Sequence, residues 1–210
     1  MTKELSRRIL RSLKKHYGDV RPDLNFGSLY QLAVAVILSA QTTDRQVNAV
    51  TPVLFRKYPD FATLARAEIR DVEEIIRSTG FYRNKARSIV ELARELAEKH
   101  GGKLPGTLPD LLKLPGIGRK SANVILSMGF NRPALAVDTH VLRLANRLGY
   151  AQTENPDRAE EALTSIIPEK DWTQTHLLLI RHGRAVCKAR HPLCRDCPVI
   201  SLCGYEGKTL

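Results

Sequence analysis

The chain has 210 residues, of which 43% are hydrophobic and 26% are charged, and this composition excludes an intrinsically disordered protein. A chain of this length can bury a hydrophobic core without disulfide bonds. Lysine and arginine number 33 against 22 acidic residues, a formal charge of +11. That balance points to a polyanionic partner, most often nucleic acid, although charge alone is equally compatible with an inert cationic surface.

The N-terminal segment is charged throughout and lacks the apolar core of a signal peptide. Four apolar residues recur at every fourth position and predict an amphipathic helix with a basic outer face: Leu5, Ile9, Leu13 and Tyr17. The longest apolar run, residues 32–40, is about half of what a bilayer requires and predicts a buried core helix. With no membrane segment or targeting signal in view, we expect a cytoplasmic protein without membrane contact.

Helical periodicity dominates the chain, and the alternation typical of strands is scarce. Two apolar stripes have helical spacing: Ile89, Leu92, Ala93, Leu96 and Ala97, and then Val141, Leu144, Ala145 and Leu148. Glycine and proline gather at five places: residues 19–27, 101–109, 114–118, 131–133 and 155–157. These breaks divide the chain into segments of helical length, which predicts an all-α protein of roughly ten helices.

A glycine-rich turn separates two predicted helices between residues 108 and 129. The first carries Leu111 and Leu112, and the second begins at Arg119 with an apolar stripe of Ala122, Ile125, Leu126 and Gly129. Gly116 and Gly118 would let the backbone turn tightly and approach another molecule closely. The helix that follows presents unpaired amides and the positive end of its dipole. Together with Arg119 they predict a phosphate cradle. The alternative is an ordinary turn between helices.

Two residues next to this turn are candidates for chemistry. Lys120 lies in the first turn of the second helix, where a lysine is ordinarily a solvated surface charge. A phosphate cradle beside it would bring a DNA sugar within reach of its amine, which can act as a nucleophile. Asp138 precedes a helix predicted to begin at Thr139, so it is expected to be an N-cap. A capping carboxylate is also a fixed negative charge that can stabilise a cationic sugar.

All four cysteines lie between residues 187 and 203, with the spacing C-x6-C-x2-C-x5-C. In a reducing cytoplasm they are expected to be metal ligands rather than disulfides. Four thiolates suit Zn²⁺ or a [4Fe–4S] cluster, and only Cys194 and Cys197 form a short CxxC pair, so the spacing leaves both open. Five lysines or arginines and no acid lie in residues 181–195, which indicates that this loop faces phosphate.

Five segments in this order resemble the endonuclease III family of helix-hairpin-helix DNA repair glycosylases. They are LSAQTTD (38–44), TGFYRNKA (79–86), LPGIGRKSAN (114–123), VDTHV (137–141) and the four cysteines. The resemblance covers essentially the whole chain and implies two α-helical lobes. Residues 22–131 would form the lobe with the helix-hairpin-helix motif. Residues 1–21 and 132–210 would form the lobe with the C-terminal iron–sulfur cluster loop.

The resemblance also implies a function. The chain would be a bifunctional DNA N-glycosylase and AP lyase of base excision repair, which removes oxidised pyrimidines and cleaves 3′ to abasic sites by β-elimination. Lys120 would form the Schiff base, facing the catalytic Asp138 across a cleft. A [4Fe–4S] cluster would be the cofactor, held by Cys187, Cys194, Cys197 and Cys203. We expect a monomer that binds damaged double-stranded DNA and is associated with the nucleoid when bound.

The resemblance assigns DNA contacts as well. Gln41 and Phe81 would fill the space left by the everted base. Leucine is more usual in the family at the second position, and the alternatives are a polar helix end for Gln41 and a core aromatic for Phe81. Further contacts are expected from Gly116, Gly118, Arg119, His140, Lys188 and Arg190. Two rival functions are a glycosylase without lyase activity, against which Lys120 counts, and a DNA-binding protein without enzymatic activity.

Overall fold

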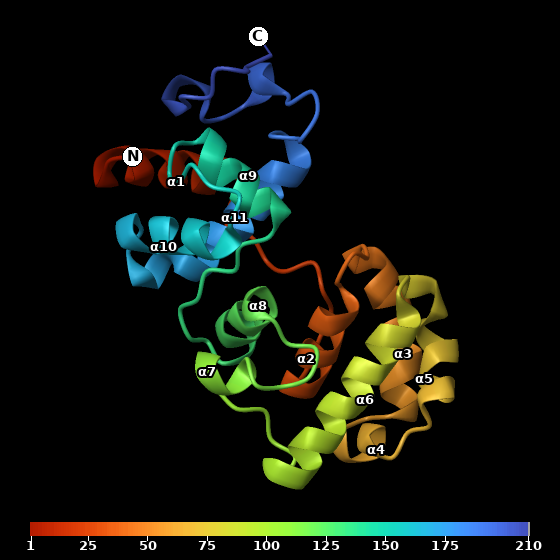
Figure 1. Ribbon diagram of the computed structural model, residues 1–210. Helices are drawn as coiled ribbons and strands as arrows, with labels where there is room; N and C mark the ends of the chain where they lie inside the picture. Colours follow the sequence, from red (N-terminus) through yellow and green to blue (C-terminus); the bar gives the residue numbers. More distant parts are fainter. Residues whose placement is uncertain (210) are drawn as a thin grey trace. The chain divides into compact units, whose positions relative to one another are not determined.

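The computed structural model describes residues 1–209, and these residues form helices and loops with no strand (Figure 1). The prediction of an all-α fold is therefore confirmed. The α-helices are α1 (Lys3–Tyr17), α2 (Leu29–Leu38), α3 (Asp44–Lys57), α4 (Phe61–Ala65), α5 (Ile69–Ile76), α6 (Tyr82–Lys99), α7 (Leu108–Leu111), α8 (Arg119–Gly129), α9 (Thr139–Arg147), α10 (Pro156–Ile166) and α11 (Trp172–Ala185). Four 3₁₀ turns accompany them: η1 (Arg77–Thr79), η2 (Glu169–Asp171), η3 (Cys194–Asp196) and η4 (Ile200–Leu202).

The chain divides into two compact units. The first is Pro22–Arg132, and the second joins Met1–Arg21 to the chain from Pro133 onward. The first unit therefore holds α2 to α8, which include the glycine-rich turn. The second holds α1, α9, α10, α11 and the cysteine segment, residues 187–203.

Helix α2 forms the centre of the first unit. Residues 32–38 are all buried, as the apolar run predicts. Helix α8 packs against α2 so closely that a Cβ at Gly129 would lie 2.5 Å from Leu29 Cδ2. Helix α6 packs against α4 and α5 through the predicted stripe, whose one exposed member is Ala97 in the last turn.

The second unit is built around α11, which packs against both α9 and α1. The predicted stripe of α9 is buried along its whole length, and α1 buries Ile9 and Leu13. A Cβ at Gly183 in α11 would meet His140 Cβ in α9 at 3.0 Å, so a small residue permits this helix contact. Ser6 in α1 and Tyr150 are joined by a buried hydrogen bond of 2.9 Å between their hydroxyl groups.

Each of the five predicted breaks lies at a boundary between helices. The last of them, residues 155–157, marks the start of α10, which follows α9 in the chain. The Asn155 side chain accepts hydrogen bonds from the amides of Asp157 and Arg158, and Pro156 occupies the first turn. Proline is favoured there because that amide has no partner within the helix.

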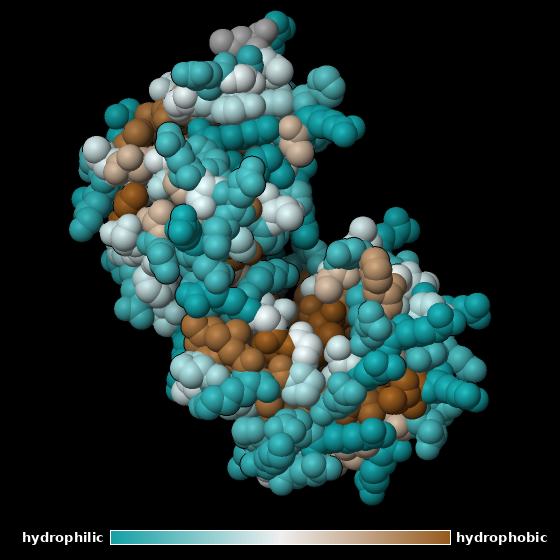
Figure 2. Space-filling model, in the orientation of Figure 1, coloured by the Kyte–Doolittle hydropathy of each residue, from teal (hydrophilic) through white to brown (hydrophobic). Residues whose placement is uncertain are grey.

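The surface is mainly polar on the face in Figure 2, where hydrophilic residues predominate and the hydrophobic ones gather in several patches. Among residues 1–209, no helix is both long and apolar enough to cross a membrane. A partner that approaches the face shown therefore meets mostly polar side chains, on a chain whose formal charge is +11.

Candidate nucleic-acid interface and cysteine pocket

The two glycines of the predicted phosphate cradle have different roles. Gly116 has a φ of +74°, and a Cβ there would lie 2.9 Å from Ser88 Cβ. Only glycine suits this position, because both the backbone and the space exclude a side chain. Gly118 has a φ of −92°, and a Cβ there would meet no atom within 4 Å. The turn therefore depends on Gly116, while Gly118 leaves open space in front of α8.

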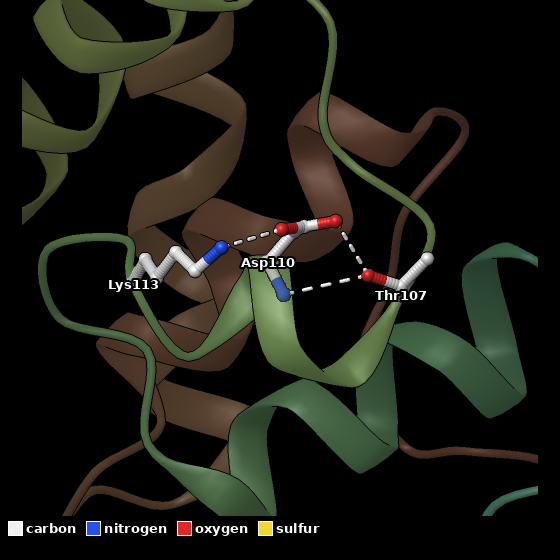
Figure 3. A network of polar contacts seen from close by, with 3 residues as sticks. All are labelled: Thr107, Asp110 and Lys113. Atoms are coloured by element: carbon white, nitrogen blue, oxygen red, sulfur yellow. Dashed lines mark hydrogen bonds and ion pairs between the residues drawn. The ribbon is translucent and has the colours of Figure 1, made fainter.

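Helix α7 is only four residues long, and polar contacts between one of its side chains and two flanking residues stabilise it (Figure 3). Thr107 caps the helix, and its hydroxyl donates to Asp110 Oδ2 at 2.7 Å. Lys113 Nζ lies 2.9 Å from Asp110 Oδ1. The hydrogen bond from Thr107, followed by that from Lys113, lowers the pKa of Asp110. Leu111 is buried, whereas Leu112 ends the helix and is 42% exposed.

The N-terminus of α8 has no side-chain cap. Gly118 occupies the capping position and has no oxygen to offer the first amides. Helix N-termini of this kind bind anions through free amides and the helix dipole. Lys120 is exposed in the first turn, and Arg119 beside it is half-buried. The first unit thus presents a helix end open to a phosphate, with an amine next to it.

Asp138 is the N-cap of α9 in the second unit, as expected. Its Oδ1 accepts hydrogen bonds from the amides of His140 and Val141, both at 2.8 Å. The His140 ring Nδ1 lies 3.0 Å from an Arg143 guanidinium nitrogen, and burial is the main cause that lowers the pKa of His140. The carboxylate is therefore held in one orientation by backbone amides of the helix that it caps.

Gln41 and Phe81 are both exposed residues of the first unit with left-handed backbone conformations. Their φ values are 51° and 47°. The Phe81 side chain is 63% exposed, which excludes the core-aromatic alternative. Helix α2 ends at Leu38, so Gln41 lies in the loop beyond it rather than at the helix end. Both side chains are thus available to a ligand of the first unit.

The four cysteines line one pocket in the second unit, and all four are free thiols. Cys194 is buried and the other three are half-buried. An Arg147 guanidinium nitrogen lies 3.3 Å from Cys187 Sγ, and His182 Nε2 lies 3.5 Å from Cys197 Sγ. Burial is the main cause that raises the pKa of Cys197. Within the described chain, no group of three or more His, Cys, Asp or Glu side chains could hold a metal ion.

Two arginines of α9 hold the beginning of the cysteine segment. Arg143 donates to the carbonyls of Cys187 at 3.1 Å and Gly183 at 3.0 Å. Arg147 donates to the carbonyls of Lys188 at 2.7 Å and Ala189 at 3.0 Å. Sequence analysis missed both arginines, whose only signal is an i, i+4 spacing that a solvated helix face shares. Lys188 and Arg190, which were predicted to contact DNA, are exposed.

Residues 34–169 match the HhH-GPD superfamily of base excision DNA repair proteins. The chain belongs to this superfamily. Endonuclease III of Synechocystis sp. is 46% identical over 202 residues, which cover 96% of this chain and 92% of that protein. Endonuclease III of Escherichia coli is 38% identical over 208 residues, which cover 99% of each. The predicted membership of the endonuclease III family is therefore confirmed.

The fold of this HhH-GPD protein also matches solved structures. A trapped covalent intermediate between endonuclease III and DNA has a TM-score of 0.93 and 42% sequence identity, over 97% of this chain and 96% of that chain. A thermostable thymine-DNA glycosylase, at 22% identity, has a TM-score of 0.87. The first match shows that the chain has the fold of endonuclease III. The second shows that the same fold occurs at low sequence identity.

Proposed function

We propose that this protein is a bifunctional DNA N-glycosylase and AP lyase of base excision repair. The observation that carries the proposal is the exposed Lys120 beside the uncapped N-terminus of α8. A phosphate bound at that helix end brings a deoxyribose close to the amine. Membership of the endonuclease III family supports the same activity, because an endonuclease III forms a covalent intermediate with DNA.

The hairpin binds the DNA backbone in this proposal. Phosphate oxygens accept hydrogen bonds from the first amides of α8, and the helix dipole and Arg119 add positive potential. Gly118 contributes by having no side chain in the open space before the helix. Gly116 contributes indirectly, because it shapes the turn that exposes those amides.

Lys120 carries the chemistry. The neutral amine attacks C1′ of the damaged nucleotide, a C1′–N bond to lysine forms, and the glycosidic bond breaks so that the base departs with its electron pair and takes up a proton. The attached amine loses one proton, and O4′ takes up a proton as the C1′–O4′ bond breaks, which opens the sugar ring and gives the protonated Schiff base. Removal of a C2′ proton then expels the 3′ phosphate, which is the β-elimination. Asp138 supplies a fixed negative charge that stabilises the cationic sugar.

The substrate in this proposal is duplex DNA with an oxidised pyrimidine or an abasic site, and the protein acts as a cytoplasmic monomer that joins the nucleoid on binding. Gln41 and Phe81 enter the stack after the base is everted. His140, Lys188 and Arg190 add contacts to the DNA, of which the two exposed cations meet phosphates. The exposure of Phe81 supports the wedge role, since an aromatic ring stacks well on bases.

We also propose that Cys187, Cys194, Cys197 and Cys203 hold a [4Fe–4S] cluster. Four free thiols around one pocket fit a group that takes four thiolates. Membership of the endonuclease III family favours the cluster over a single zinc. An Arg147 guanidinium nitrogen lies 3.3 Å from Cys187 Sγ and places a positive charge beside the pocket. The bound cluster supplies structural support to the loop that bears Lys188 and Arg190.

The test is incubation with duplexes that contain an oxidised pyrimidine, an adenine mismatch or an abasic site. We expect release of the oxidised base together with strand cleavage 3′ to the site, before any treatment with alkali. Base release without strand cleavage would instead identify a glycosylase that lacks the lyase step. Binding with neither reaction would identify a DNA-binding protein, and either outcome would overturn the proposal.

A further inference from the structure

Lys85 in the first turns of α6 is a buried lysine without an acidic partner. Lys85 is only 5% exposed. Among residues 1–209, its ammonium group forms no ion pair with a carboxylate. Lysine is almost never buried unless it is paired, because an ammonium group loses hydration. Burial accordingly lowers the pKa of Lys85. A group that opposes folding in this way needs another reason to be present.

The ammonium group of Lys85 joins two loops of the first unit. Its Nζ donates to Thr42 Oγ1 at 2.5 Å and to the carbonyl of Thr79 at 2.8 Å. The Thr42 hydroxyl also contacts that same Thr79 carbonyl, and it lies 3.2 Å from the carbonyl of Ala40. Lys85 Nζ, the Thr42 hydroxyl and the Thr79 carbonyl thus contact one another in pairs. These contacts connect the loop after α2 and the end of η1 to helix α6.

Both carbonyls lie within two residues of a residue proposed to enter DNA. The Ala40 carbonyl belongs to the peptide bond that precedes Gln41. The Thr79 carbonyl belongs to the peptide bond that precedes Gly80, whose next residue is Phe81. Gln41 and Phe81 are two of the four non-glycine residues with positive φ among residues 1–209. Such conformations persist where the surroundings hold them, and they gather at functional sites.

We propose that Lys85 is a positioning residue that holds Gln41 and Phe81 as a preformed pair, ready to enter the duplex as the base is everted. The inference rests on the proposed function, since it assigns a cause to the opening step of that reaction. A lysine suits the task because one ammonium group donates in several directions at once. An apolar side chain of similar length fills the same space but donates to neither the Thr42 hydroxyl nor the Thr79 carbonyl.

Lys85→Met separates this role from a merely structural one. Thr42 and Thr79 still contact each other after the substitution, and a buried charge is removed. The thermal midpoint should therefore stay equal or rise, because replacing a buried charge by an apolar group is often stabilising. A residue needed only for folding would lower the midpoint. The matched control is Lys99→Met, which removes an exposed charge of the same helix, paired with Glu95 at 3.0 Å.

The readout is the rate at which 2-aminopurine, placed opposite an abasic site in a duplex, gains fluorescence on unstacking. We expect Lys85→Met to slow this rate by about tenfold or more, the size expected when a hydrogen bond from a charged group is lost. Lys99→Met should match the unsubstituted protein. An unchanged rate in folded Lys85→Met would overturn the proposal. If Lys85→Met does not fold, Thr42→Val should slow opening while Thr42→Ser does not.

The same rate, measured in a variant that already lacks both inserting side chains, tests whether Lys85 acts through them. In a Gln41→Ala, Phe81→Ala background, Lys85→Met should cause no further slowing, because it acts through those two side chains. Additive slowing in that background would assign Lys85 a different role. Cleavage of a single-stranded abasic oligonucleotide by the unsubstituted protein reports the lysine chemistry without duplex opening. Failure to cleave both this oligonucleotide and the abasic duplex would sink the proposed function, while the fluorescence comparison would still decide the role of Lys85.

Discussion

The glycine-rich hairpin and the cysteine segment are stabilised in different ways. Short-range interactions within the chain hold the hairpin: Gly116 sets the turn, and Thr107, Asp110 and Lys113 hold α7 in front of it. The cysteine segment, residues 187–203, contains only two 3₁₀ turns and places four free thiols around one pocket. Arginines from α9 hold its first residues by their carbonyls.

This difference teaches how each region acquires its shape. The hairpin is preorganised by the polypeptide, so its amides are ready for a phosphate before any ligand binds. The cysteine segment has only two short 3₁₀ turns as regular structure and, in our proposal, depends on a bound cluster for its stability. Loss of a cysteine should therefore change the cofactor content as well as the DNA affinity. Substitutions in the hairpin should change the stability or the DNA affinity and leave the cofactor content unchanged.

The largest effect is expected from Cys194→Ser, which removes the buried thiol of the four. The unsubstituted protein should carry about four irons per chain and absorb broadly in the visible range. The variant should lose both, together with DNA affinity, because the loop that bears Lys188 and Arg190 loses its support. Metal analysis, absorption and DNA binding measure this, with Ser201→Ala as the control. A colourless zinc protein from anaerobic purification would contradict the cluster.

Asp138→Asn should lower the rate of the reaction by about 10²–10⁴-fold or more, the range of a lost acid–base contribution, to which loss of the fixed charge adds. Asparagine is also a good N-cap, so α9 and the thermal midpoint should be retained. Single-turnover cleavage of an abasic duplex and thermal unfolding check the two parts. A variant with full activity would remove Asp138 from the mechanism.

The hairpin glycines give a paired test. Gly116→Ala forces a left-handed alanine, which costs about 1–2 kcal/mol, and brings its Cβ against Ser88, so both stability and DNA affinity should fall. Gly118→Ala meets no atom of the protein, so it should weaken DNA binding without lowering the thermal midpoint. Equal affinity in Gly118→Ala and the unsubstituted protein would mean that phosphate does not approach that space.

Lys188→Ala and Arg190→Ala should produce the smallest change. Each should weaken binding to every duplex alike and reduce the slope of log affinity against log salt by about one unit. Titrations of damaged and undamaged duplexes at several salt concentrations measure this. A change in lesion preference at constant slope would instead mean that the loop reads bases.

Sequence alone predicts the parts that rest on local rules. The apolar spacing of α2, α6 and α9 predicts their buried faces, and Asp138 is recognisable as a cap before Thr139. The family follows from motifs in a fixed order, whose resemblance to endonuclease III is confirmed by relatives that match nearly the whole chain.

What escapes sequence analysis depends on contacts between distant segments. Lys85 reads as one more surface lysine, and only the packing of two loops on α6 buries it. Arg143 and Arg147 reach carbonyls about forty residues away, which helical spacing does not encode. Gly116 and Gly118 look equivalent in the sequence, but the space beside each differs because only the first faces Ser88.

The most direct test of the central claim is borohydride trapping on an abasic duplex by the unsubstituted protein and by Lys120→Gln. Borohydride reduces a Schiff base and leaves the protein covalently attached to DNA. We expect a stable adduct with the unsubstituted protein. With Lys120→Gln we expect no adduct and no strand cleavage, while DNA binding is retained because the amides of α8 remain. Trapping by Lys120→Gln at the level of the unsubstituted protein would mean that another amine is the nucleophile.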